Sequence, residues 1–353
     1  MSHLRQDPLT GRWVIMAAGR RGRPNEYPLR REKGGDPADC PFCLGQEART
    51  TREILAVGRQ KNSSPNTAGW RLRVFPNLYP ALTPEGSGPS LHDPDEEVPS
   101  SELFVQEPGV GAHEIIAYSP DHNAGLGTLS LEDLTELLQV LQERFATLAK
   151  DPKHRCILQF VNHGAEAGAT LSHPHLQILA MPMVPLAVQE KLDRMEVYRR
   201  QEGRCLLCDL LAAERKKGIR IIDENENWTA FAPWASRFPW EMMLVPRRHQ
   251  GSIMEATSME LHELARLLGK VLGRLDVLHG DPPLNLIIQG APLENELPKA
   301  YFAEGTEAVD GFHWHVEVCP RLSRLAGFEA GSGFAINSVL PEEAAGRLRE
   351  QEG

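Results

Sequence analysis

The sequence has no long hydrophobic run, no excess of basic residues and no apolar segment near its start. No stretch approaches the roughly 18 consecutive apolar residues that a membrane-spanning helix needs, so the membrane is not an expected partner. The first residues, MSHLRQDPLTGRW, also lack the apolar core of a secretory signal peptide. Together these absences predict a cytoplasmic location.

Positive charge is also in deficit, because the 353 residues carry a formal net charge of −10. Non-specific binding of nucleic acid requires a basic surface, so nucleic acid is not an expected partner. A few clustered arginines could still bind a small anion, and residues 18–23, AGRRGR, form such a cluster. A solvated loop is the alternative interpretation of that segment.

Hydrophobic residues are plentiful, at 41% of the chain, and can build a sizeable core. The length suits one large domain or two of ordinary size. Cysteine is scarce, but four of the six cysteines form two C-x-x-C pairs, Cys40 with Cys43 and Cys205 with Cys208. In a chain without a secretory leader, such pairs bind metal more often than they form structural disulfides.

Each pair opens a stretch of sequence with the same order of motifs. An apolar run ending near a histidine follows the pair, then a helical pattern, a second apolar run and a His-x-His motif. This repetition of strand, helix and strand predicts an α+β protein with two related halves, residues 1–182 and residues 183–353. The parts are EIIAYSPDH, 131–148, CILQFVN and His173-Pro174-His175 in the first half, and EMMLVPRRH, 257–275, LNLIIQ and His313-Trp314-His315 in the second.

Local signals mark the ends and connections of these elements. Ser130 with Asp133, and Thr257 with Glu260, have the spacing of a helix-capping box. Residues 80–112 are acidic and rich in Pro, Gly and Ser, which predicts a long mobile loop. We expect the charged segment 183–204 to link the halves.

Two sets of four residues fit a structural zinc site. Such a site takes four thiolate or imidazole ligands in a tetrahedron and leaves no position open for substrate. Its role would be to hold loops together and to orient neighbouring residues. The alternative is that the cysteines are small buried hydrophobes and the histidines ordinary core residues. The two sets are Cys40, Cys43, His122 and His173, and Cys205, Cys208, His249 and His313.

The segment TLSHPHLQ places three polar side chains on alternate positions. On an extended strand His173, His175 and Gln177 share one face, and Pro174 stiffens the segment. If a metal holds His173, then His175 is a rigid neutral imidazole, which is a competent nucleophile toward phosphorus. Gln177 could donate its amide to a phosphate oxygen. The alternative roles of His175 are a second metal ligand or a core histidine.

Four motifs together, CPFC, SPDH, HPH-x-Q and FHWH, resemble the galactose-1-phosphate uridylyltransferase branch of the histidine-triad superfamily. The resemblance covers nearly the whole chain. It implies two histidine-triad-like halves from an internal duplication, each a mostly antiparallel sheet with helices. It also implies a homodimer whose sites are completed across the subunit boundary, with two Zn²⁺ ions per chain.

The resemblance implies a two-step transfer of UMP between UDP-glucose and galactose 1-phosphate. His175 would attack the α-phosphorus of the NDP-sugar, release a hexose 1-phosphate and carry the nucleotide as a covalent nucleotidyl-histidine, which a second hexose 1-phosphate then collects. Binding roles carried over by position fall on Arg20 and Arg23 for phosphate, Asn77 for the base and ribose, Asn162, Gly168, Ala169, Thr170 and Gln177 for the nucleotidyl phosphate, and Arg324, Gly327, Phe328 and Glu329 for the sugar or phosphate.

Some residues depart from the pattern of the better-known uridylyltransferases. Thr170 stands where they have serine, and GATLSHPH resembles a plant-type branch that includes an ADP-glucose phosphorylase. The alternative activity is therefore adenylyl transfer from ADP-glucose to inorganic phosphate. A non-catalytic, zinc-stabilised nucleotide-binding protein is a further alternative. Some relatives carry iron in the second half, but the two cysteines there favour zinc. Beside His315, Glu317 replaces the glutamine, and its negative charge predicts a structural role for that histidine.

Overall fold

The computed structural model describes residues 2–22, 34–60, 62–85, 105, 107–293 and 311–352. Arg23 and most of the predicted loop at 80–112 therefore lie outside the described residues. The described part of that loop includes a parallel bridge between Thr83 and Val110, directly before the strand that begins at Ala112.

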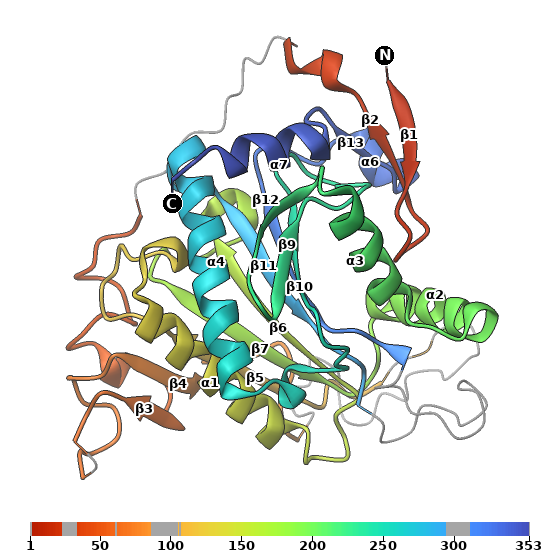
Figure 1. Ribbon diagram of the computed structural model, residues 1–353. Helices are drawn as coiled ribbons and strands as arrows, with labels where there is room; N and C mark the ends of the chain where they lie inside the picture. The colour runs from red at the N-terminus through yellow and green to blue at the C-terminus, as the bar shows by residue number, and fades with distance from the viewer. Residues whose placement is uncertain are drawn as a thin grey trace.

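A ten-stranded sheet runs through the molecule in the order β3-β4-β5-β7-β6-β11-β12-β10-β9-β8 (Figure 1). Every neighbouring pair is antiparallel. The strands are β3 Leu55–Val57, β4 Leu72–Pro76, β5 Ala112–Ala117, β6 Cys156–His163, β7 His175–Met181, β8 Ile221–Glu224, β9 Trp228–Phe231, β10 Met242–Pro246, β11 Leu284–Gln289 and β12 His315–Pro320.

The strand order reads as a mirror image about the pair β6 and β11. The first half supplies β3, β4, β5, β7 and β6, and the second half supplies the corresponding β8, β9, β10, β12 and β11. This confirms the predicted α+β fold with duplicated halves. The two halves share one continuous sheet, because Asn162 of β6 pairs directly with Asn285 of β11.

Two long helices, α1 (Leu131–Leu148) and α4 (Ser258–His279), occupy corresponding places in the two halves and lie side by side. Each begins where its capping residue predicts. The Ser130 side chain accepts a hydrogen bond from the Asp133 N–H, and the Thr257 side chain accepts one from the Glu260 N–H. Their apolar faces form one core with alternate residues of the sheet, including Leu141, Leu176, Ile178, Leu264 and Val318.

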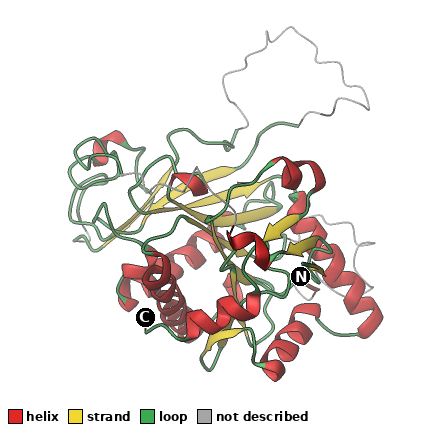
Figure 2. Cartoon of the chain, turned by 90° about the horizontal axis from the view of Figure 1, so that it is seen from above, coloured by secondary structure: helices red, strands yellow, loops and turns green. Residues whose placement is uncertain are grey.

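The two halves differ in what covers the opposite face of the sheet. In the second half, α2 (Leu186–Glu202) and α3 (Leu206–Lys217) pack on it through a core that includes Leu192, Leu207 and Met243. In the first half, the covering residues come from the segment that contains Cys40, Phe42 and Trp70. The predicted link at 183–204 is thus largely the helix α2. From above, the strands cross the middle of the molecule among the helices (Figure 2).

The two ends of the chain meet in a second, three-stranded sheet. Strand β2 (Trp13–Met16) pairs antiparallel with β1 (His3–Gln6) and parallel with β13 (Ala335–Asn337). Among the described residues, the remaining helices are α6 Gly327–Ser332 and α7 Pro341–Arg349, with short 3-10 helices η1 Ala18–Gly22, η2 Glu47–Arg49, η3 Leu126–Thr128, η4 Ala165–Ala167 and η5 Ile253–Glu255.

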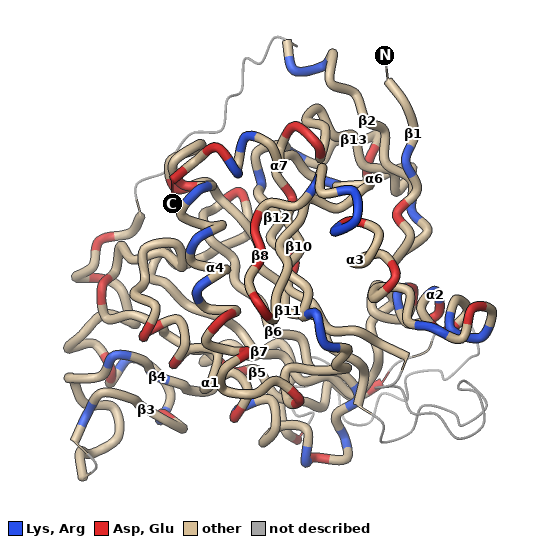
Figure 3. Tube along the Cα trace, in the orientation of Figure 1, with Lys and Arg blue, Asp and Glu red and all other residues tan. Residues whose placement is uncertain are grey.

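Charges of both signs are distributed over the trace, and α2 carries acidic and basic residues together (Figure 3). Among the described residues, none of the helices combines the length and apolar character that crossing a bilayer demands.

A buried ion pair joins α1 to the sheet on the face opposite Gln177. The Arg144 guanidinium donates two hydrogen bonds to Glu114, of 2.9 and 2.7 Å, and both side chains are buried. Removing one member leaves the other charge buried without a partner. We therefore expect Glu114→Ala to lower the free energy of unfolding by about 3–5 kcal/mol, measured by urea denaturation. The double variant Glu114→Ala/Arg144→Leu should be the more stable of the two. A loss below about 1 kcal/mol, typical of exposed pairs, would contradict this prediction.

Candidate active site and metal centres

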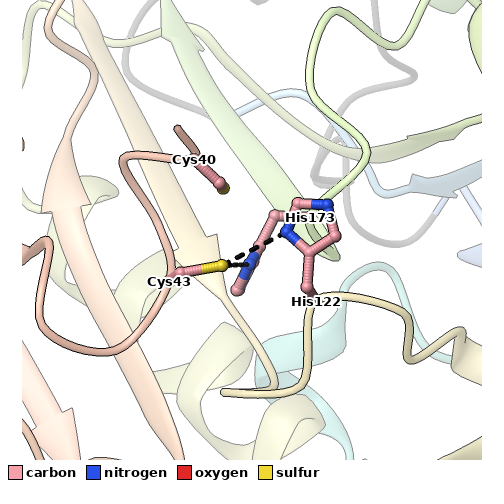
Figure 4. A group of neighbouring side chains, drawn as sticks. All are labelled: Cys40, Cys43, His122 and His173. Atoms are coloured by element: carbon pink, nitrogen blue, oxygen red, sulfur yellow. Dashed lines mark hydrogen bonds between the residues drawn. The ribbon is translucent and has the colours of Figure 1, made fainter. Parts of the chain in front are cut away.

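The first set of four predicted metal ligands comes together in the structure. The ligand atoms of Cys40, Cys43, His122 and His173 all lie within 4.8 Å of one another, and all four residues are buried. Cys43 Sγ lies 3.2 Å from Nδ1 of His122 and 3.5 Å from Nδ1 of His173 (Figure 4). A tight turn brings the two thiols together, since the Cys43 N–H bonds the Cys40 carbonyl.

Hydrogen bonds to the outer nitrogens fix how the two imidazoles are presented. Nε2 of His173 lies 2.9 Å from the Ser119 carbonyl, which can only accept, so Nε2 carries the proton. Nε2 of His122 lies 2.8 Å from Oγ of Ser172. In both rings Nδ1 faces the thiols, and in His173 it must hold a lone pair. Outer partners of this kind orient histidine ligands in zinc sites.

The charges that the first set can carry also suit a metal. Burial, together with the neighbouring Cys40, raises the pKa of Cys43 to about 11. Burial lowers the pKa of His173 to about 4. The set thus offers a neutral imidazole at His173, together with a thiol at Cys43 that a bound cation would have to convert to a thiolate. This two-cysteine, two-histidine set fits a tetrahedral Zn²⁺ ion.

The second set also converges. The ligand atoms of Cys205, Cys208, His249 and His313 lie within 4.8 Å of one another. Cys208 Sγ is 3.5 Å from Nδ1 of His249 and 3.3 Å from Nδ1 of His313. The two cysteines sit at the N-terminus of α3, where the helix dipole favours a thiolate. Hydrogen bonds from Cys208 and the two imidazoles lower the pKa of Cys205 to about 2. The donor set again fits Zn²⁺.

His175 begins strand β7, two residues beyond His173 of the first Cys/His set. Its Nδ1 lies 2.8 Å from the backbone carbonyl of His173, which fixes the proton on Nδ1 and leaves the lone pair on Nε2. The ring is buried and packs edge-to-face with the Phe42 ring at a centroid distance of 5.5 Å. Burial lowers the pKa of His175, which favours the neutral ring. The arrangement gives a fixed imidazole with a single available lone pair.

Gln177 is held by a residue that the sequence analysis missed. His113 on β5 lies on the same face of the sheet, and its Nε2 is 2.9 Å from Oε1 of Gln177. The Ala81 N–H donates to Nδ1 of His113 at 3.1 Å, so Nε2 is the nitrogen that carries a proton. The amide NH₂ of Gln177 therefore remains available as a donor. Asn77 lies beside this group, with Nδ2 at 3.3 Å from Nε2 of His113.

Asn162 lies near the end of β6. The segment that connects β6 to β7 contains two glycines with positive φ, Gly164 at 80° and Gly168 at 85°. They bracket η4, and the Ala169 N–H turns back to bond the Gly164 carbonyl at 3.2 Å. Thr170, at the end of this turn, is exposed. Backbone turns of this kind can direct N–H groups at an anion, as predicted for this segment.

The remaining predicted contacts are brought together only in part. Arg324 bonds Glu166 in the turn after β6, at 2.7 Å. Residues 327–329 lie on α6, far from β7 in Figure 1. Exposed Arg20 lies on η1, where its neighbour Arg21 bonds Glu343 of α7 at 2.7 Å. Within one chain, therefore, Arg20 is not beside His175.

In the second half, His315 corresponds to His175, and charged side chains surround it. Nδ1 of His315 lies 3.0 Å from the His313 carbonyl, as in the first half. Its Nε2, however, lies 3.4 Å from both Lys191 Nζ and Glu317 Oε1, and Lys191 and Glu317 form an ion pair. Arg237 also bonds Glu317, at 2.7 Å. His315 is fully buried, and its Nε2 is already in contact with charged side chains of the same chain.

The comparisons with known proteins agree with this geometry. Models of the galactose-1-phosphate uridyl transferase N-terminal and C-terminal domains match residues 1–185 and 191–351. The chain is 33% identical to ADP-glucose phosphorylase of Arabidopsis thaliana, over 98% of this chain and 92% of that protein. It is 31% identical to galactose-1-phosphate uridylyltransferase of Thermotoga maritima, over 100% of this chain and 99% of that protein.

Solved structures show the same relationship. A crystal structure of the Arabidopsis thaliana ADP-glucose phosphorylase with bound ADP-glucose matches with a TM-score of 0.80 at 30% identity, over 100% of this chain and 99% of that one. A uridylyltransferase structure matches with a TM-score of 0.71 at 26% identity, over 99% of this chain and 97% of that one. The chain therefore belongs to the galactose-1-phosphate uridylyltransferase family, a family of nucleotidyl-transferring enzymes.

Proposed function

We propose that this protein moves UMP between UDP-glucose and galactose 1-phosphate through a covalent nucleotidyl-His175. The observation that carries the proposal is the bond from Nδ1–H of His175 to the His173 carbonyl at 2.8 Å. It holds the ring in one orientation with Nε2 as the attacking atom. Family membership and the uridylyltransferase relatives support the reaction.

In the first step, Nε2 of His175 would form a bond to the α-phosphorus as the bond from that phosphorus to the bridging oxygen breaks. The hexose 1-phosphate then leaves with the bridging oxygen. In the second step, a phosphate oxygen of the acceptor would attack the same phosphorus and release the imidazole. The amide N–H groups of Gln177 and Asn162 are the donors we assign to the non-bridging oxygens, where negative charge is held.

Adenylyl transfer is the second candidate, because one specific observation favours it. The ADP-glucose phosphorylase relative combines 33% sequence identity with a TM-score of 0.80 for its ADP-glucose complex. In that alternative the same His175 would carry AMP, and inorganic phosphate would be the acceptor. A non-catalytic nucleotide-binding role is the third reading, and the fixed lone pair of His175 argues against it.

We propose that both Cys/His sets bind Zn²⁺ and act by holding the fold. The first set would lock His173, whose carbonyl in turn holds His175. Metal binding requires the paired cysteines of each set to be reduced, which supports a cytoplasmic location.

We also propose a homodimer. Arg20 lies away from His175 of its own chain, so a phosphate contact from Arg20 would have to be made in a second subunit. We also propose that the boundary between the two halves lies between residues 182 and 183.

The covalent step can be tested with His175→Gly. We expect this variant to fold but to lose at least about a thousandfold in transfer rate, because the attacking nitrogen is gone. Mass spectrometry of the wild-type protein after mixing with UDP-glucose should show one added UMP, located at position 175. The control His262→Gln, at a half-buried histidine of α4 that contacts Thr135 of α1, should keep its rate. An unmodified wild-type protein, or normal turnover by His175→Gly, would remove the catalytic assignment.

The same mass measurement distinguishes the two nucleotides. Parallel incubations with UDP-glucose and ADP-glucose should label the protein with UMP faster than with AMP if uridylyl transfer is the activity. Faster labelling by AMP, and discharge of that adduct by inorganic phosphate rather than galactose 1-phosphate, would establish the phosphorylase alternative.

Metal content provides a further test. We expect Cys40→Ser to lose one zinc ion per chain relative to the wild type, and to unfold at lower temperature, because a hydroxyl is a poor zinc ligand. The matched control is Cys156→Ser, at a buried cysteine outside both sets. It should keep its zinc. Equal zinc in the wild type and Cys40→Ser, measured by elemental analysis, would rule out the first site.

A further inference from the structure

The side chain of Asn285 contacts the segment after β6 from the other half of the chain. Asn285 lies on β11 directly opposite Asn162 of β6. Its Nδ2 donates to Oδ1 of Asn162 at 2.7 Å and to the backbone carbonyl of Ala167 at 2.9 Å. One amide group therefore holds both the side chain of Asn162 and the turn that follows it.

Two neighbours fix the orientation of the Asn285 amide. Nε of Arg321 bonds Oδ1 of Asn285, and a guanidinium can only donate. The Ala167 carbonyl on the other side can only accept. Turning the amide by 180° would point its NH₂ at the guanidinium and its oxygen at the carbonyl, and both contacts would become repulsive. Arg321 is itself held, because its guanidinium stacks 4.1 Å from the Phe238 ring centroid.

The orientation of Asn285 sets the orientation of Asn162. Oδ1 of Asn162 is occupied by the Asn285 donor, so its NH₂ group is the end left for a ligand. Strand register places this group near the nucleophile. Phe160 of β6 pairs with Gln177 of the antiparallel β7. Asn162, two residues after Phe160, therefore lies on the same face and beside His175, two residues before Gln177.

The backbone approaches closely at the same place. A Cβ added to Gly164 would lie 2.8 Å from Cβ of Pro283, which directly precedes β11. The turn is therefore seated against the start of β11, where Asn285 holds it by the Ala167 carbonyl. The second half of the chain thus contacts the turn through both its backbone and its side chains.

We propose that Asn285, oriented by Arg321, is a positioning residue that makes Asn162 and the turn after it present hydrogen-bond donors to the nucleotidyl phosphate. This proposal rests on the proposed function and deepens it. It assigns the second half of the chain a part in phosphate recognition. Gln177 is prepared in a parallel way in the first half, because its oxygen is occupied by His113 and its NH₂ group is left free. The side-chain amides of Gln177 and Asn162 would then both direct their NH₂ groups at the same anion.

The variant Asn285→Asp tests the proposal, because it preserves shape and the contact with Arg321 but has no N–H. The carboxylate would accept from Asn162 and turn the Asn162 oxygen toward the phosphate. We expect UMP to bind about 10- to 100-fold more weakly, the usual effect of a hydrogen bond to a charged group. Binding of uridine, which has no phosphate, should change by less than about twofold, within normal surface-mutation effects. AMP and adenosine form the corresponding pair of probes if adenylyl transfer is the activity.

A double-mutant cycle separates this effect from simple charge repulsion. In an Asn162→Ala background, Asn285→Asp should weaken nucleotide binding clearly less than it does in the wild type, because the part of its effect that acts through Asn162 is already lost. An equal loss in both backgrounds, an equal loss for uridine, or no loss at all would overturn the proposal. Its failure is distinguishable from failure of the proposed function. If the wild-type protein forms the His175 adduct but Asn285→Asp binds UMP normally, only the positioning role is wrong. If no adduct forms at all, the catalytic assignment is wrong.

Discussion

The arrangement of the site depends on one short hydrogen bond within the His-Pro-His motif. The carbonyl of His173 accepts the Nδ1 proton of His175, and the side chain of His173 is part of the first Cys/His set. A single residue therefore joins the two proposed sites, with its imidazole in the Cys/His set and its carbonyl bonded to His175. Strain or displacement at the Cys/His set would be passed directly to the reacting nitrogen. A metal bound by the first Cys/His set would thus affect the proposed reaction through this coupling, without taking part in it.

The second half retains the same hydrogen bond but not the same chemistry. His315 is held by the His313 carbonyl, yet its Nε2 faces the Lys191 and Glu317 ion pair. Helix α2 supplies Lys191 and covers this face, whereas in the first half the corresponding face carries the segment around Phe42. Duplication has preserved the scaffold, and a change of neighbours has converted one of the two equivalent positions into a salt-bridged core. The contact of the second half with the turn after β6 is made through Asn285 rather than through a histidine.

Much of the architecture could be predicted from the sequence, because the determinants are local. The repeated motif order predicted two related halves, the spacing of leucines and the capping residues located α1 and α4, and the two C-x-x-C pairs indicated both convergent sets. The His-x-His spacing also predicted which side chains share a face.

Other features depended on pairing between distant strands and could not be read from the sequence. His113 and Asn285 lie in short, largely apolar runs, GAHEII and LNLIIQ, and only the strand register shows what they contact. The link at 183–204 was expected from its charge, but its packing as α2 follows from apolar residues spaced among those charges. The position of Arg20 depends on the three-stranded sheet that joins the two ends of the chain.

The seam between β6 and β11 has a consequence for the origin of the fold. An antiparallel pairing of equivalent strands, with the remaining strands mirrored on either side, is the contact that two identical halves make across a two-fold axis. Either half on its own would expose that strand as an open edge, ready to pair with another copy. The present chain is thus equivalent to a symmetric dimer fused into one polypeptide. Covalent linkage allows its two members to diverge, so that one carries the proposed nucleophile and the other the proposed positioning residue.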